Sequence, residues 1–87
     1  MQKFTKEIAD ILIKDRDWRV RAEVARQGYG LDILVDDEDC DVRYEVAKQG
    51  YGLDILVDDE DCDVRDEAIK QLKKHLTSEK NIVMLYI

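Results

Sequence analysis

The side chains that could do chemistry in this chain are two cysteines, one histidine and many carboxylates. The cysteines are Cys40 and Cys62, and the only histidine is His75. These three cannot complete a structural zinc site, because such a site takes four cysteine or histidine ligands. No serine or cysteine has a base partner nearby in the pattern, since the only histidine falls in the last predicted helix. The sequence therefore predicts no catalytic residue, no metal ligand and no cofactor-binding residue.

Two acidic runs, residues 36–41 and 58–63, raise the question of calcium, because hard cations prefer oxygen ligands. The known calcium-binding loop does not fit them. Counting from Asp37, the sixth position is Val42 instead of glycine, and the twelfth is Lys48 instead of glutamate. We interpret the runs as a solvated acidic edge that also supplies helix caps.

Arginine and aspartate recur at fixed positions. The arginines are Arg21, Arg43 and Arg65, and the aspartates four residues before them are Asp17, Asp39 and Asp61. One hypothesis is an anion site formed by the arginine row. The other is a structural ladder, in which each arginine bonds to aspartates at the helix starts of its own and neighbouring units. The planar fork of arginine suits such bidentate pairing, so we favour the ladder.

Aromatic side chains are the first candidates for contact with a partner. Tyr29 and Tyr51 recur in successive copies of one turn, and either pack between units or form an exposed row. Trp18 either anchors a partner or fills the open first end. Together with the acidic residues Asp37 and Asp59, these aromatics make the set of candidate partner-binding residues.

The elements that must position these residues are copies of one segment. Residues 28–49 and 50–71 differ at three positions only, and residues 6–27 form a more distant copy at the same step of 22 residues. A fixed period of this size is typical of a solenoid, in which each unit covers the apolar face of its neighbour. We predict a single helical-repeat domain over residues 1–87, with residues 72–87 as C-terminal cap and tail.

Each unit is predicted to hold two helices. The first is short, residues 31–35, with apolar side chains at i, i+3 and i+4. The second spans about residues 40–49 and follows Asp39, whose carboxylate can accept the free amide hydrogens of the first turn. Val42 should face inward. Gly50 then supplies the left-handed residue that ends the helix.

The ends of the array depart from this pattern. A helix in residues 4–14 replaces the glycine turn at the start. Leu-Lys-Lys stands at residues 72–74 where the repeat has Gly-Tyr-Gly, so the last helix should continue from about residue 63 to 75 or 76 as a capping unit. The tail, residues 81–87, is the most apolar stretch and would be prone to strand pairing if left free. It either folds back over the last unit or pairs with a second chain.

Charge limits the partners. The chain carries 14 basic and 21 acidic residues, a net charge of −7. Nucleic acids and anionic membranes are therefore disfavoured, and a basic protein or peptide is the first partner class to test.

The sequence also predicts where the protein works and how its cysteines behave. It shows no signal peptide and no apolar run near the length of a membrane span, so we predict a cytoplasmic protein. Cysteines on neighbouring helices, about 8–10 Å apart, would not reach the separation of about 7 Å or less that a disulfide needs. We therefore expect reduced thiols.

The repeated core resembles the HEAT-type helical repeats, and most closely their leucine-rich repeat variant. That family carries an Asp-x-Asp-x-x-Val-Arg-x-x-Val-Ala pattern, which appears here at residues 15–25 and 37–47 and, with its last two positions changed, at 59–69. The resemblance implies a right-handed superhelix in which a short 3₁₀-like helix alternates with an α-helix. It says little about activity, because such repeats serve many partners.

Two functions follow as expectations. The first is a non-catalytic protein–protein interaction module. The alternative is a self-associating structural protein that assembles through the solenoid ends or through residues 81–87.

Overall fold

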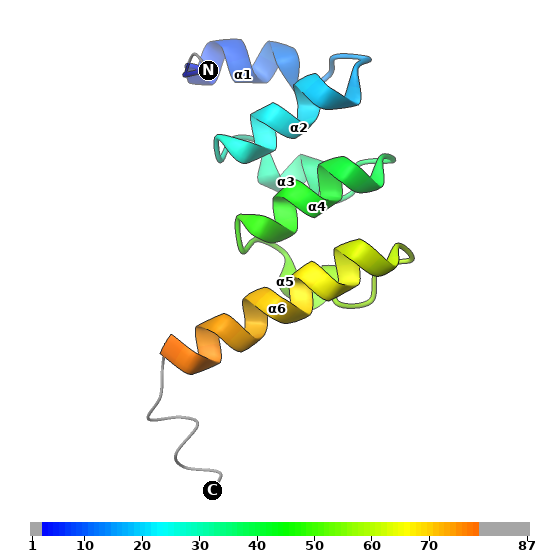
Figure 1. Cartoon of the computed structure of the whole chain (residues 1–87). Helices are drawn as coiled ribbons and strands as arrows, with labels where there is room; N and C mark the ends of the chain where they lie inside the picture. The colour runs from blue at the N-terminus through cyan, green and yellow to red at the C-terminus, as the bar shows by residue number, and fades with distance from the viewer. Residues whose placement is uncertain (1–2, 79–87) are drawn as a thin grey trace, which may run out of the picture.

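The computed structural model describes residues 3–78, so the predicted tail at residues 81–87 lies outside the described residues. The described residues form six α-helices and no strand, which confirms the all-α class for this part of the chain (Figure 1). The helices are α1 Lys6–Leu12, α2 Trp18–Arg26, α3 Leu31–Leu34, α4 Cys40–Lys48, α5 Leu53–Leu56 and α6 Cys62–Ser78. None of these helices combines the length and apolar character needed to cross a membrane.

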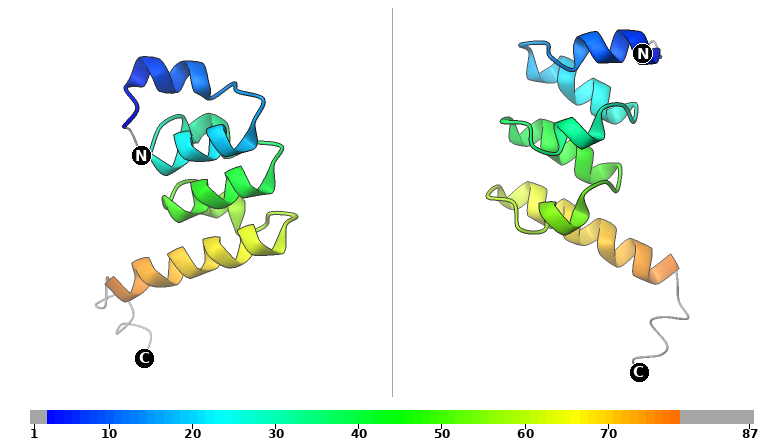
Figure 2. Two further views of the ribbon diagram at one scale, coloured as in Figure 1. Left: turned by 45° about the horizontal axis from the view of Figure 1, so that its top comes forward. Right: turned by 180° about the vertical axis from the view of Figure 1, so that it is seen from behind.

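The longer helices lie side by side in chain order. Helix α4 packs against both α2 and α6, whereas α2 and α6 do not contact each other. The short helices α3 and α5 each contact the longer helix before and after them. Seen from behind, α3 and α5 lie on the same side of the longer helices (Figure 2). Packing in the described part therefore joins only elements that are close in sequence.

The core consists of small and branched apolar side chains. Val42 and the corresponding Val64 have exposed fractions of 0%, so the predicted inward positions are confirmed. Leu34 and Leu56, which also correspond, are the largest fully buried side chains. Short side chains at these positions let the helices approach closely, and burial of apolar surface stabilises the contact.

Glycine ends the repeated helix as predicted. The amide of Gly50 (φ 81°) donates to the Ala47 carbonyl at 2.9 Å, and the amide of Tyr51 donates to the Val46 carbonyl at 3.4 Å. This pair of bonds satisfies carbonyls that the helix itself leaves free, and it needs a left-handed residue at the position of Gly50. Helix α4 itself ends at Lys48, slightly before the predicted boundary.

The end helices differ from the repeat in the predicted way. Helix α6 has 17 residues because Leu72 replaces the terminating glycine, and it begins after Asp61 as expected for this cap. The first helix is shorter than the predicted residues 4–14. It begins after Thr5, whose hydroxyl accepts a hydrogen bond from the Ile8 amide and so caps α1.

The short helix is an α-helical turn and not the 3₁₀-like turn that the resemblance implies. The amide of Val35 donates to the Leu31 carbonyl at 3.0 Å, and the amide of Leu34 donates to the Gly30 carbonyl at 2.9 Å. Both are i→i−4 bonds, which define the α-helix.

Candidate functional site

Each of the first two repeat arginines bridges two units. Arg43 donates from Nε and Nη2 to the two carboxylate oxygens of Asp59, at 2.8 and 3.0 Å, and from Nη1 to the Asp37 carbonyl at 2.7 Å. Arg21 makes the same bonds to the Asp37 carboxylate and the Asp15 carbonyl. The hydrogen bond to the carboxylate is the main cause that raises the pKa of both arginines.

The partner carboxylates of this ladder differ from the predicted ones. The prediction placed Asp39 and Asp61 opposite the arginines, but these side chains cap α4 and α6, and Asp17 caps α2. The cap geometry explains the difference. A carboxylate at the helix start accepts the amide hydrogens of its own first turn, so it is held there and does not pair with the arginine of the neighbouring unit.

The capping role also affects the pKa of Asp61. Its carboxylate accepts hydrogen bonds from the Val64 amide at 3.1 Å and the Asp63 amide at 2.9 Å. The bond from Val64 is the main cause that lowers the pKa of Asp61. A lowered pKa means that the cap stabilises the fold at neutral pH and loses this effect in acid.

Asp37 and Asp59, predicted as partner-binding residues, are used inside the fold. Their side chains are 9% and 7% exposed in their ion pairs with Arg21 and Arg43. Arg65 occupies the same position in the third unit, where its Nη1 donates to the carbonyls of Asp59 and Glu60.

The aromatic candidates separate into exposed and packed residues. Trp18 and Tyr51 are 40% and 41% exposed, so both remain open to a partner. Tyr29 is half-buried, and its hydroxyl donates to the Phe4 carbonyl at 3.1 Å. The structure thus places Tyr29 against the N-terminal segment and leaves Tyr51, the same position in the next unit, uncovered.

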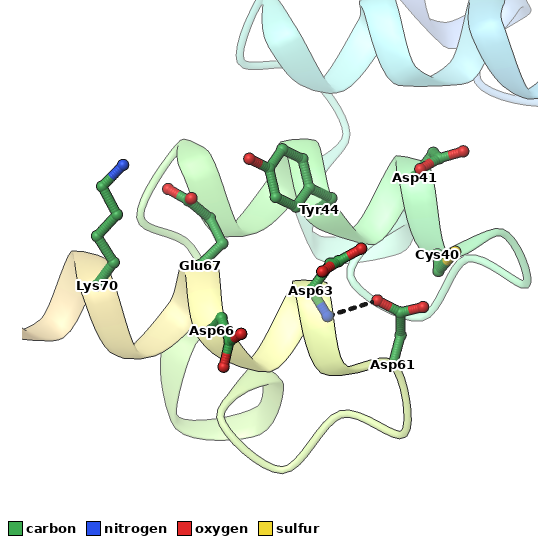
Figure 3. Close-up of a pocket in the computed structure, with 8 residues that line it drawn as sticks. All are labelled: Cys40, Asp41, Tyr44, Asp61, Asp63, Asp66, Glu67 and Lys70. Carbon is green, nitrogen blue, oxygen red and sulfur yellow. Dashed lines mark hydrogen bonds between the residues drawn. The ribbon is translucent and has the colours of Figure 1, made fainter.

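A groove between α4 and α6 gathers five acidic side chains (Figure 3). Its volume is about 350 Å³. The lining residues are Cys40, Asp41, Tyr44, Asp61, Asp63, Asp66, Glu67 and Lys70. Five carboxylates therefore meet one lysine and one aromatic ring in this acidic groove. Tyr44, Asp66 and Glu67 were not among the predicted site residues, and Asp63 was predicted only as part of the acidic edge at residues 58–63.

One signal in the sequence could have pointed to the acidic groove. Tyr44 and Asp66 occupy the same repeat position, one of the three at which the two closest copies differ. The groove lies where these two copies meet, so the differing residues come together in space. The Tyr44 ring is half-buried, and the Lys48 ammonium lies 5.8 Å from its centroid. This is the distance range of a cation–π contact.

Cys40 is not activated as a nucleophile in this groove. A hydrogen bond to Asp61 is the main cause that raises the pKa of the Cys40 thiol, and burial raises it further. A raised pKa lowers the thiolate fraction, and the thiolate is the reactive form. Cys40 and Cys62 are both free thiols, as expected from the helix spacing.

One group of described side chains could bring metal ligands together. Asp39, Cys40 and Asp41 offer ligand atoms that lie within 4.8 Å of one another. The Asp39 carboxylate already accepts the Asp41 amide at 2.8 Å as the cap of α4. We therefore assign no metal to these residues.

Exposed isoleucines recur on α1 and on the short helices α3 and α5. Ile11, Ile33 and Ile55 occupy the same repeat position and are 72%, 60% and 54% exposed. Their exposure could have been predicted from the sequence, because they fall outside the i, i+3, i+4 set that forms the inward face of the short helix. On α6, Ile69 and Leu72 are also exposed, at 40% and 39%.

No protein-family model, no curated protein and no solved structure matches this chain.

Proposed function

We propose that this chain is a non-catalytic protein-interaction module that binds a basic segment of another protein in the acidic groove between α4 and α6. The observation that carries the proposal is the lining of this groove, which consists of five carboxylates, one lysine, Cys40 and Tyr44. The net charge of −7 acts in the same direction, because it attracts a basic partner over a longer range.

The carboxylates of the groove differ in how free they are. Asp61 caps α6, so its oxygens are largely engaged. Asp41, Asp63 and Asp66 are exposed, and their side chains make no ion pair with the described residues. A single exposed ion pair is worth only about 0–1 kcal/mol. Several such pairs, together with an aromatic surface, are needed for useful affinity, and this groove offers both.

The proposal includes the repeat class. We propose a right-handed superhelix of the HEAT-like type, closest to the leucine-rich repeat variant. Three features support it: the contacts between helices that are neighbours in sequence, the arginine ladder that recurs from unit to unit, and the glycine turns. A repeat array of this kind offers a regular surface to a partner.

A peptide titration tests the proposal. The probe is a short fluorescent peptide in which arginine and lysine alternate with glycine, followed by fluorescence anisotropy. We expect binding that weakens as salt is raised, because salt screens exposed charges. The double variant Asp63→Asn/Asp66→Asn should weaken binding several-fold, since it removes two of the free groove carboxylates.

A matched variant controls for net charge. Asp32→Asn/Asp54→Asn makes the same charge change at exposed positions of α3 and α5, away from the groove, and should leave the affinity nearly unchanged. Absence of peptide binding would overturn the proposal. Equal losses in the two double variants would show that net charge attracts the peptide and that the groove does not.

The alternative function is self-association. The exposed Ile69 and Leu72 of α6 support it, because apolar side chains on a terminal helix can pack against a second copy. The sequence also suggested self-association through the apolar tail, residues 81–87, which lies outside the described residues.

A further inference from the structure

Glu67 is a buried carboxylate that forms no ion pair within residues 3–78. The residue is 6% exposed and lines the acidic groove. Its one hydrogen bond within the described part of the chain comes from Gln71 Nε2, at 2.6 Å from Oε2. No lysine or arginine among the described residues forms an ion pair with it. Burial of an unpaired charge is costly, so a cation that binds this carboxylate would lower that cost.

The first two units show what this repeat position binds. Glu23 and Glu45 correspond to Glu67, and both contact Arg26. Arg26 donates from Nη1 to the Glu23 carboxylate and from Nη2 to Glu45 Oε2 at 3.2 Å. The hydrogen bond to Glu45 is the main cause that raises the pKa of Arg26. One guanidinium thus joins the glutamates of two neighbouring units.

The next junction lacks this guanidinium. Lys48 stands at the position of Arg26, one unit later. Its ammonium lies 5.8 Å from the Tyr44 ring centroid and forms no ion pair with Glu45 or Glu67 in the described structure. A lysine has no planar fork to join two carboxylates. Of the two glutamates, Glu67 is the one that lines the acidic groove.

We propose that Glu67 receives an arginine side chain of the basic partner, in the arrangement that Arg26 has with Glu45 across the preceding junction. This inference rests on the proposed function and adds the identity of the side chain that is recognised. Glu67 lies between Lys70 and Tyr44 along the groove (Figure 3). A guanidinium can donate to the carboxylate and stack on the ring at the same time, whereas an ammonium acts as a point charge.

Two matched peptides test the inference on the full chain. One carries a single central arginine flanked by glycines and lysines, and the other carries lysine at the centre. We expect the arginine peptide to bind about tenfold more tightly, because the guanidinium can make two hydrogen bonds to the carboxylate where an ammonium acts as a point charge. Glu67→Gln should remove this preference. Glu60→Gln, an equal charge change at an exposed loop residue that does not line this groove, should preserve it.

A second variant fills the site from within. Lys48→Arg places a guanidinium where Arg26 stands in the preceding unit, so it should reach Glu67 and compete with the peptide. We expect a raised melting temperature and a several-fold weaker affinity for the arginine peptide. These readouts do not depend on whether Glu67→Gln folds.

The possible failures are distinct. If neither peptide binds, the proposed function falls and the arginine site falls with it. If both peptides bind equally and neither Glu67→Gln nor Lys48→Arg changes their ratio, the groove recognises charge only and the arginine site alone is overturned.

Discussion

Asp37 and Asp59 each accept two kinds of hydrogen bond at once. The Asp59 carboxylate takes the Asp61 amide at 2.9 Å, which fixes the loop before α6, and it takes both nitrogens of the Arg43 fork. Asp37 does the same with the Asp39 amide and Arg21. A loop conformation and a contact between units therefore depend on the same carboxylate.

Arg43→Ala should destabilise the protein far more than Arg65→Ala. Loss of Arg43 leaves the Asp59 carboxylate, 7% exposed, without its cation, and breaking such a pair costs about 3–5 kcal/mol. Arg65 donates only to the carbonyls of Asp59 and Glu60 within the described structure, so its loss should cost about 1–2 kcal/mol. Urea unfolding at neutral pH measures both. Equal losses would show that the carboxylate pair adds nothing to the carbonyl contacts.

The sequence predicted that the arginines pair with the helix-start aspartates of their own and neighbouring units, but the carboxylates that cross to them are Asp37 and Asp59. Asp37 and Asp39 have the same side chain and lie two residues apart. Their roles differ because the helix begins directly after Asp39, which turns that carboxylate toward the first-turn amides. Chain spacing alone does not determine which of two neighbouring carboxylates crosses to the next unit.

At the scale of the elements, the Gly-Tyr-Gly turn uses its two glycines for different reasons. Gly50 needs its left-handed backbone to end α4, and an added Cβ there would make only an ordinary van der Waals contact, 3.5 Å from His75 Nε2. Gly52 (φ 65°) precedes α5 and lies against the preceding unit. There an added Cβ would lie 2.7 Å from Val35 Cγ2.

Gly52→Ala should therefore cost more stability than Gly50→Ala. Both changes force a side chain into the left-handed region, at about 1–2 kcal/mol. Gly52→Ala also pushes Val35 out of its packed position, and overpacking adds about 1–3 kcal/mol. Thermal unfolding of the two variants gives the comparison. A larger loss for Gly50→Ala would mean that helix termination matters more than the contact between units.

Helix starts and stops followed from local signals, whereas the acidic groove did not. Aspartate caps and glycine stops act within a few residues, so the sequence predicted α4 and α6 closely. The groove combines Tyr44 of one unit with Glu67 of the next. Which side chains meet across that junction depends on how the two helices are offset, and a period of 22 residues does not specify the offset.

At the scale of the whole molecule, the charge and the exposed apolar side chains have opposite effects on association. Ile69 and Leu72 remain exposed on α6, and exposed isoleucines recur on α1, α3 and α5. A net charge of −7 makes two copies repel each other. The balance of these two effects decides between the proposed function and self-association.

We expect both the full chain and a chain that ends at Lys80 to be monomers by light scattering at physiological salt. Charge repulsion should outweigh the small apolar area that the last helix exposes. A dimer of the full chain that dissociates when residues 81–87 are removed would contradict this expectation and favour self-association through the tail.

The arginine ladder has a direction. Arg21 and Arg43 each reach from their own unit to an aspartate of the following one, so an internal unit supplies an acceptor to the unit before it and a donor to the unit after it. An internal copy could thus be duplicated or deleted in frame without leaving a mismatched junction. The number of internal copies is then free to vary in evolution, while the first and last segments stay single.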